Sequence, residues 1–289
     1  MSIPLEKYGG SGLKVTWLSS QLWCEQQLDF RLEFGEKKTV EKTIGKDRHQ
    51  ELYEEITTLV PVLPRTIEDM VATRFHNIQV GISNLLTEGL TRELPTFGKI
   101  NSIFVKGIID ELRIQDGQVK VIDHKTRRSN RMPGIAQKIT TEFQLMLYYD
   151  FLNSCRLGKV NHLDLMNHYK FDSTAHISNE FKDDLDIKGQ SIESNVEKLA
   201  KNTFNSFRKI PELSPELTIM YEHQETKNRI GEHIFVFDNE WFSRNVEFVM
   251  EYWLGEMKPR KVNPRNSWKC NYCEYKMKCF IDSDQRTLI

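Results

Sequence analysis

The stretch that decides the fold is residues 101–125, NSIFVKGIIDELRIQDGQVKVIDHK. It contains two runs rich in β-branched residues, separated by Asp116-Gly117. An Asp-Gly pair between two such runs is a strong signal for a β-hairpin, because both residues tolerate the positive φ angles of a tight hairpin turn. We therefore predict an antiparallel hairpin over 101–125.

The predicted hairpin brings two carboxylates together. Asp110 and Asp123 are equidistant from the turn at 116–117, so they face each other across the strands. Because side chains alternate between faces, Asp123 and Lys125 point the same way and His124 points the opposite way. Carboxylates that bind Mg²⁺ or Mn²⁺, beside a lysine, suit phosphodiester hydrolysis. A surface salt bridge, contributing at most about 1 kcal/mol, is the alternative that spacing alone leaves open.

Helical patterns flank this hairpin and indicate an α/β fold. The first, at 47–60, starts with Asp47 as its cap and has His49 in its first turn. Further helices are predicted at 66–87, 136–153, 190–208 and 239–254, with strand-like segments at 162–171, 217–225 and 232–238.

The composition is that of a folded soluble protein. The 289 residues include 40 Lys and Arg against 41 Asp and Glu, a net charge of −1, with 28% charged and 39% hydrophobic residues. No apolar run approaches the roughly 18 residues of a membrane span, and the first ten residues lack the apolar stretch of a secretory signal. We expect an intracellular protein without a membrane partner, in which any site for nucleic acid depends on local charge.

The five cysteines are unevenly placed. Cys270, Cys273 and Cys279 fall within ten residues, and an odd count in an intracellular protein argues against a disulfide framework. Cys24 is the candidate for a fourth thiolate. Four thiolates suit either a zinc ion or a [4Fe–4S] cluster, and the spacing leaves both open. Cys155 follows a predicted helix and is expected to pack in the core.

Four short motifs resemble those of RecB-type PD-(D/E)xK nucleases, in the order of that family: Gly45-x3-His49, Gly107-Ile108-Ile109-Asp110, Asp123-His124-Lys125 and Gln144-x3-Tyr148. The resemblance implies a restriction-endonuclease-like α/β fold with a central mixed sheet flanked by helices. It implies Mg²⁺ or Mn²⁺ as a cofactor, bound by His49, Asp110 and Asp123. The catalytic residues it implies are Asp110, Asp123, Lys125, Gln144 and Tyr148.

The chain is similar to the eukaryotic exonuclease V family along nearly its whole length. The similarity lies in segments 4–6, 23–27, 88–95, 107–113, 125–128, 221–226 and 268–270. It implies a metal-dependent exonuclease specific for single-stranded DNA, with 5′-end entry and sliding, acting in DNA repair. A monomer, a single-strand-binding protein as partner, and a nuclear location, with cytosol or mitochondrion as alternatives, are the accompanying expectations.

The same resemblance implies a [4Fe–4S] cluster held by Cys24, Cys270, Cys273 and Cys279, which joins the N- and C-terminal segments of the domain. Residues 1–289 are then one nuclease domain. Its parts are an N-terminal cluster segment (1–44), a catalytic core (45–155), the remaining sheet and helices (156–257) and a C-terminal cluster and basic segment (258–289).

Local charge indicates where DNA would bind. Basic residues are in excess from 120 to 131 and from 258 to 279, and phosphate contacts by such residues give sequence-independent binding. Trp268, Tyr272 and Tyr275 either stack on unpaired bases or shield the cluster. A DNA-binding iron–sulfur module without nuclease activity is the alternative function. The predicted DNA contacts are Arg127, Arg128, Arg131, Trp268 and Lys269.

Overall fold

The predicted hairpin lies at the centre of the fold. A computed structural model describes residues 2–37 and 39–279 of the chain. Strands β3 (Ile103–Gln115) and β4 (Gln118–Arg127) pair antiparallel, and Asp116 and Gly117 have the positive φ angles, 52° and 77°, of a tight turn. Glu111 pairs with Ile122, which confirms the predicted register.

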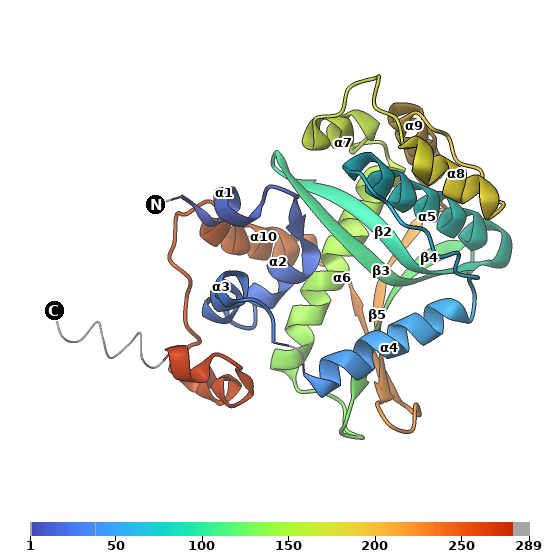
Figure 1. Cartoon of the computed structure of the whole chain (residues 1–289). Helices are drawn as coiled ribbons and strands as arrows, with labels where there is room; N and C mark the ends of the chain where they lie inside the picture. The colour runs from blue at the N-terminus through green and yellow to red at the C-terminus, as the bar shows by residue number, and fades with distance from the viewer. Residues whose placement is uncertain (1, 38, 280–289) are drawn as a thin grey trace.

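The hairpin belongs to a sheet of six strands, and the predicted mixed sheet flanked by helices is confirmed (Figure 1). One edge of β3 pairs antiparallel with β2 (Leu90–Ile100), and the other edge pairs with β4 and, in parallel, with the short β1 (Leu13–Lys14). β5 (Leu213–His223) runs parallel to β4, and β6 (Arg229–Val236) antiparallel to β5. The segments predicted at 217–225 and 232–238 are therefore strands, whereas β2 was not predicted.

Three long helices lie close to their predicted positions: α5 (Ile67–Glu88), α6 (Ile135–Arg156) and α10 (Asn239–Trp253). The Thr66 side chain accepts a hydrogen bond from the backbone N–H of Asp69 and so caps α5, which ends at Gly89 in the left-handed conformation. α6 crosses one face of the sheet (Figure 1). Its buried residues include Phe143, Leu147, Phe151 and Cys155, the last as expected.

The helix that carries His49 begins earlier than predicted. α4 (Val40–Glu54) is capped by Thr39, whose hydroxyl accepts from the backbone N–H of Lys42. The prediction of Asp47 as the cap is wrong, because Gly45 lies inside the helix instead of ending the preceding turn. A Cβ at Gly45 would lie 3.5 Å from the Thr126 hydroxyl, so α4 packs closely against β4.

The segment predicted as a strand at 162–171 is a helix, α7 (His162–Tyr169). The Asn161 and Asp164 side chains form a capping box that starts this helix, a local signal that outweighs the strand-like composition. The helix predicted at 190–208 is shorter, α9 (Val196–Phe207), and α8 (Asn179–Ile187) precedes it.

The N-terminal helices pack beside the C-terminal part of the chain. α1 (Pro4–Tyr8), α2 (Val15–Gln21) and α3 (Glu25–Phe34) lie next to α10 and near the 3₁₀ helix η1 (Pro264–Tyr272) (Figure 1). None of the helices within residues 2–37 and 39–279 is long and apolar enough to cross a lipid bilayer. The end of the predicted C-terminal basic segment, 280–289, lies outside the described residues.

Candidate active site and thiolate cavity

The two hairpin strands separate at the predicted carboxylates. Pairing between β3 and β4 ends at Glu111 and Ile122, and β4 continues alongside β5. The Asp110 side chain bridges the opening, since its Oδ2 accepts a hydrogen bond of 2.9 Å from the backbone N–H of His124. The His124 ring points to the opposite side, where its Nε2 lies 3.3 Å from Glu111 Oε2, so the predicted alternation of faces is confirmed.

Lys125 and Asp123 form a close ion pair. The Lys125 Nζ lies 2.9 Å from Asp123 Oδ1 and 2.8 Å from Oδ2. From α6, the Gln144 amide donates to Asp123 Oδ1 at 3.1 Å and to the Tyr148 hydroxyl at 3.4 Å. The structure therefore brings Gln144 and Tyr148 to the carboxylate side of the pair, where Gln144 fixes the orientation of Asp123.

Burial sets the charge of this pair. The Asp123 side chain is 1% exposed, and burial raises its pKa to about 6, opposed by the Lys125 ammonium and assisted by the nearby charge of Asp110. Burial lowers the pKa of Lys125, but the Asp123 and Asp110 carboxylates outweigh it and raise that pKa overall. Within residues 2–37 and 39–279, no group donates a hydrogen bond of normal geometry to Asp123 Oδ2. A buried carboxylate oxygen with only an ion-pair contact fits a metal ligand.

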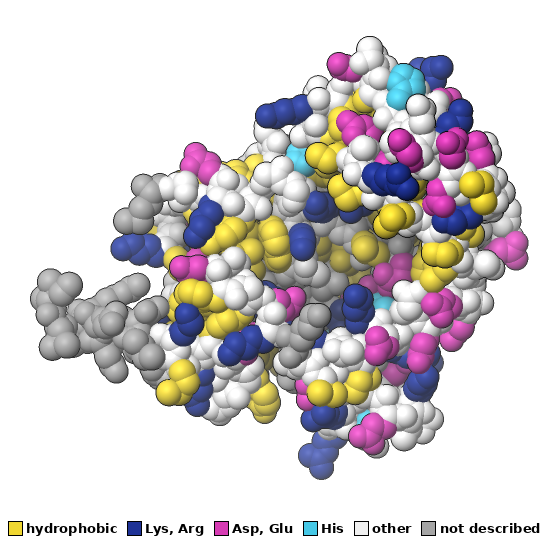
Figure 2. Space-filling model, in the orientation of Figure 1, with side chains coloured by type: hydrophobic (Ala, Val, Ile, Leu, Met, Phe, Trp, Pro, Cys, Tyr) yellow, Lys and Arg dark blue, Asp and Glu magenta, His cyan; other side chains and the backbone are white. Residues whose placement is uncertain are grey.

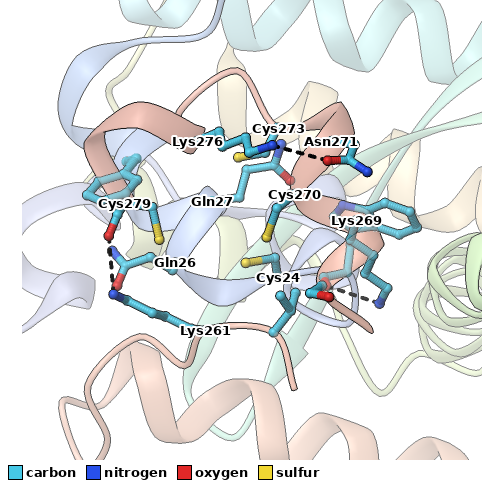
Figure 3. A pocket seen from close by; sticks show the side chains of 14 residues that line it. Cys24, Gln26, Gln27, Lys261, Lys269, Cys270, Asn271, Cys273, Lys276 and Cys279 are labelled. Carbon is cyan, nitrogen blue, oxygen red and sulfur yellow. Dashed lines mark hydrogen bonds between the residues drawn. The ribbon is translucent and has the colours of Figure 1, made fainter. Parts of the chain in front are cut away.

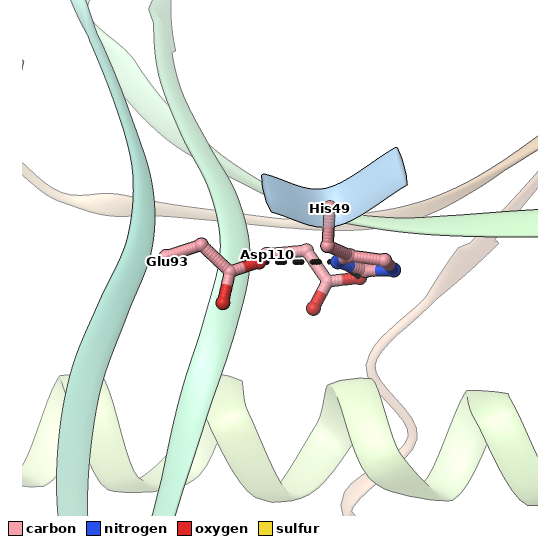
Figure 4. Close-up of side chains that lie close together, drawn as sticks. All are labelled: His49, Glu93 and Asp110. Carbon is pink, nitrogen blue, oxygen red and sulfur yellow. Dashed lines mark hydrogen bonds and ion pairs between the residues drawn. The ribbon is translucent and has the colours of Figure 1, made fainter. Parts of the chain in front are cut away.

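His49, Glu93 and Asp110 form a compact group of ligand atoms, all within 4.8 Å of one another (Figure 4). The His49 Nδ1 lies 3.1 Å from Glu93 Oε1 and 3.7 Å from Asp110 Oδ2. Its Nε2 lies 3.1 Å from the backbone carbonyl of His124. A ring nitrogen that donates to a carbonyl orients the imidazole and leaves the other nitrogen to face a metal ion. This group fits a divalent cation.

The His49 ring balances the charge of its neighbours. Burial lowers its pKa, but the hydrogen bond with Glu93 and the charge of Asp110 raise that pKa to about 9. The imidazole therefore carries a proton beside the Glu93 and Asp110 carboxylates. A divalent cation bound between the same three side chains would take the place of that proton. Oxygen ligands with one imidazole suit Mn²⁺ and, less readily, Mg²⁺.

Glu93 is the site residue that the sequence analysis missed. It lies on β2 opposite Asp110, and the ladder between β2 and β3 omits this pair, because Glu93 has a φ of 52°. A residue other than glycine in this conformation costs free energy and is often found at functional sites. No apolar run marks this strand in the sequence, because residues 90–100 (LTRELPTFGKI) mix apolar with polar residues and include a proline and a glycine.

The thiolate cavity lies between the two ends of the chain. Cys24, Cys270, Cys273 and Cys279 line one cavity of about 380 Å³, and their sulfur atoms point into it (Figure 3). Cys24 precedes α3 directly, and the other three follow α10. The structure thus brings together the four cysteines that the resemblance had grouped across 246 positions of sequence.

The surroundings of the sulfurs favour the thiol unless a cation is bound. Burial raises the pKa of Cys24 overall, although the backbone N–H groups of Gln26, Gln27 and Val262 partly offset it by favouring the thiolate. Burial also raises the pKa of Cys273, and the proximity of Cys24 and Cys270 raises it further. Thiolates that repel one another across a cavity fit a cationic metal centre. No three of these sulfurs, all of which belong to described residues, lie within 4.8 Å of one another.

Protein contacts also join the two ends. The Glu25 carboxylate is buried, with 2% of its side chain exposed, and it accepts hydrogen bonds of 2.9 Å from both Nε and Nη2 of Arg260. The Gln26 backbone N–H donates to the Arg260 carbonyl, and the Gln27 amide donates to Glu274 at 2.7 Å. The C-terminal segment is therefore fixed to α3 at several points around the cavity.

Replacing Arg260 by alanine is expected to lower the free energy of unfolding by about 3 kcal/mol, because it leaves the Glu25 carboxylate buried without its partner. Urea unfolding measures this change. Arg244→Ala is the control, since that side chain is 67% exposed and lies 3.9 Å from Glu240. Equal stability of the two variants would show that the ion pair does not hold the C-terminal segment.

The predicted DNA contacts differ in accessibility. Arg131 is exposed, Arg127 is half-buried beside Gln137, and Arg128 pairs with Glu41 on α4 at 2.9 Å. Trp268 is 39% exposed and packs edge-on against Trp23.

Two residues near the thiolate cavity are poorly placed for DNA. Lys269 is 7% exposed, donates to the Trp23 carbonyl at 3.2 Å and lies over the Trp23 ring. Tyr275 is 3% exposed, and its hydroxyl donates to the Gly35 carbonyl. These two side chains support the terminal segments instead of offering an accessible surface, whereas Tyr272 is exposed.

Four of the five predicted catalytic residues line a cavity of about 450 Å³ that we call the catalytic cavity. It is lined by residues of β1, α2, α5, β3, β4 and α6, which places it between the N-terminal helices and the sheet. Figure 2 shows that this face of the molecule is hollowed near its centre. Asp110, Lys125, Gln144 and Tyr148 are among the lining residues.

Comparisons with known proteins were made against families, curated sequences and solved structures. A family model described as Exonuclease V, a 5′ deoxyribonuclease, matches residues 4–118, 113–208 and 187–280. Exonuclease V of Danio rerio is 30% identical over 303 residues, which cover 98% of this chain and 75% of the relative. The crystal structure of SSO0001 matches at a TM-score of 0.44 and 14% identity, over 92% of this chain and 84% of its own. The crystal structure of a candidate exonuclease from Eubacterium rectale matches at a TM-score of 0.36 and 12% identity. The match covers 96% of this chain and 93% of that structure's chain.

Proposed function

Since the chain belongs to the exonuclease V family, we propose that it is a metal-dependent exonuclease that hydrolyses single-stranded DNA, entering at the 5′ end and sliding along the strand. The observation that carries this proposal is the convergence of Asp110, Asp123 and Lys125 where β3 and β4 separate. His49 and Glu93 add two further ligand atoms beside Asp110.

The residues divide into ligands and orienting groups. His49 Nδ1, Glu93 and Asp110 would hold a Mg²⁺ or Mn²⁺ ion, with Asp123 as a further oxygen ligand. Such an ion polarises the scissile phosphate and lowers the pKa of a bound water. Gln144 holds the Asp123 carboxylate in place. The Lys125 ammonium offsets the negative charge that develops on the phosphate. This electrostatic stabilisation is strongest in a site that excludes water.

A [4Fe–4S] cluster is the metal centre we propose for the thiolate cavity. A zinc ion bound at about 2.3 Å would hold its four sulfurs about 3.8 Å apart. The cavity of about 380 Å³ that the four cysteines line supports a larger group, and a cubane cluster bound by four thiolates is such a group. A zinc protein without a role in nucleic-acid metabolism is the competing interpretation.

Single-strand specificity is supported by how the site is enclosed. The Asp123 side chain is buried and Lys125 is 35% exposed, so a phosphodiester has to enter the catalytic cavity to be cut. The bases of a single strand are unpaired, so they can stack on aromatic side chains such as Trp268 and Tyr272. We further propose that the protein acts as a monomer in DNA repair, with a single-strand-binding protein as partner. The nucleus is the proposed location, with cytosol or mitochondrion as alternatives.

End-labelled oligonucleotides test this function. Linear single strands labelled at either end, circular single strands and duplexes are incubated with Mg²⁺, with Mn²⁺ or with EDTA. We expect digestion of linear single strands only, short labelled products from the 5′ label, and no digestion in EDTA. Binding to single strands without hydrolysis in either ion would contradict the proposal and support a DNA-binding iron–sulfur module.

A further inference from the structure

Three basic side chains line the catalytic cavity beside the proposed metal ligands. Lys14 comes from β1, Arg74 from α5 and Lys106 from β3, and none of them was expected to contact substrate. Lys14 and Lys106 are direct partners in the parallel ladder between β1 and β3, so their side chains leave the same face of the sheet. Like charges placed directly opposite each other on adjacent strands are destabilising. The fold thus keeps two lysines that repel each other, Lys14 and Lys106, on the wall of the catalytic cavity.

No carboxylate compensates these charges. Within residues 2–37 and 39–279, no acidic group lies within 4.0 Å of the nitrogen atoms of Lys14, Arg74 or Lys106. Lys14 instead lies over the Trp17 ring at 4.9 Å. Burial, followed by the charges of Arg74 and Lys14, lowers the pKa of Lys106 to about 8. Arg74 and Lys106 are partly buried and Lys14 is exposed, and a group of cations without an acidic partner in the described part of the chain is suited to bind an anion.

The position of this group on β3 relates it to the proposed reaction. Lys106, Ile108 and Asp110 are alternate residues of β3, so their side chains leave the same face of the strand. The Cα atoms of Lys106 and Asp110 are therefore about 13 Å apart along an extended strand, the length of a few nucleotides. Ile108, 46% exposed, lies between them and offers an apolar surface to a sugar or base.

We propose that Lys14, Arg74 and Lys106 form a subsite that binds a backbone phosphate of the DNA strand a few nucleotides from the bond that is cut. The subsite rests on the proposed function, because it holds the strand whose scissile phosphate lies at Asp110 and Lys125. The ligand is an internal phosphodiester, and a 5′-terminal monophosphate is the other source of the same chemistry.

Charge-neutral variants test the subsite. The double variant Lys106→Gln with Arg74→Gln is compared with Lys201→Gln, which removes an exposed lysine on α9. Binding to a single-stranded oligonucleotide is measured with Ca²⁺ in place of Mg²⁺ over a range of salt concentrations. We expect about tenfold weaker binding by the double variant and a slope of log K against log salt that is less negative by about 0.7, the value for one phosphate contact on a single strand. Unchanged affinity and slope would overturn the subsite.

Neutral methylphosphonate linkages locate the bound phosphate. One linkage at a time is neutralised along the oligonucleotide, with a 5′-phosphate or a 5′-hydroxyl. We expect wild type and Lys201→Gln to lose affinity at one internal position, and the double variant to be insensitive there. Sensitivity at the same position in all three proteins, or sensitivity to the 5′-phosphate alone, overturns the internal subsite. Wild-type protein that neither binds nor cuts single strands overturns the proposed function itself.

Thermal unfolding separates the subsite from a structural role. Because the double variant loses the repulsion among Lys14, Arg74 and Lys106, it is expected to unfold at the same or a higher temperature than wild type. Weaker DNA binding in a protein of equal or greater stability supports the subsite. A lower unfolding temperature would show that these side chains stabilise the fold, against the proposal.

Discussion

Lys125→Ala and Asp123→Asn are each expected to reduce DNA hydrolysis at least about 10³-fold, a loss of roughly 4 kcal/mol in transition-state stabilisation. The first removes the ammonium that lies 2.8 Å from the Asp123 carboxylate, and the second removes the charge of a buried carboxylate held by Gln144. Initial rates on a 5′-labelled single strand in saturating Mg²⁺ and in saturating Mn²⁺ measure the effect.

The same hairpin supplies the control. Asp116→Asn changes an exposed carboxyl at the turn, where φ is 52° and asparagine is also tolerated. We expect it to hydrolyse DNA at the wild-type rate, and all three variants to keep the visible absorbance of the proposed [4Fe–4S] cluster. If Lys125→Ala keeps a rate within about tenfold of wild type, the activation free energy has risen by no more than ~1.4 kcal/mol. That result would falsify the catalytic role of Lys125.

The parts of the site that could be predicted depend on local sequence. A tight turn at Asp116-Gly117 determines the hairpin register, and the register places Asp110 across from Asp123. Gln144 and Tyr148 are one helical turn apart on α6, so the Gln144 amide reaches both the Asp123 carboxylate and the Tyr148 hydroxyl. Here the local pattern and the tertiary structure lead to the same arrangement.

The parts that could not be predicted depend on pairing between distant segments. Glu93 becomes a neighbour of Asp110 only because β2 pairs with β3, and no motif marks it. Lys14 reaches the catalytic cavity through a strand of two residues, too short to be read from alternation. His49 was expected near the start of its helix. It reaches the site because α4 packs across β4.

Cys273→Ser is expected to abolish the visible absorbance of the metal centre, lower the iron content and markedly lower the unfolding temperature. Metal binding to four thiolates is also folding free energy for the segments that supply them, of order 10 kcal/mol in small zinc domains. The effect should extend to the active site. Glu274, next to Cys273, contacts Lys42 of α4 at 3.5 Å, and Lys37 donates to the Glu274 carbonyl. Because α4 carries His49, loss of the metal centre should also weaken Mn²⁺ binding.

Cys155→Ser provides the matched control, since Cys155 is fully buried and donates to the Phe97 carbonyl at 3.3 Å, away from the thiolate cavity. Both variants exchange the same atom, but only Cys273 supplies a sulfur to the proposed centre, so we expect Cys155→Ser to retain wild-type iron and absorbance. A colourless wild-type protein with one zinc per chain would contradict the [4Fe–4S] cluster while leaving the joining of the two ends intact. Equal iron content in wild type and Cys273→Ser would instead show that Cys273 is not a ligand, and the contact from Glu274 to α4 would then be independent of any metal.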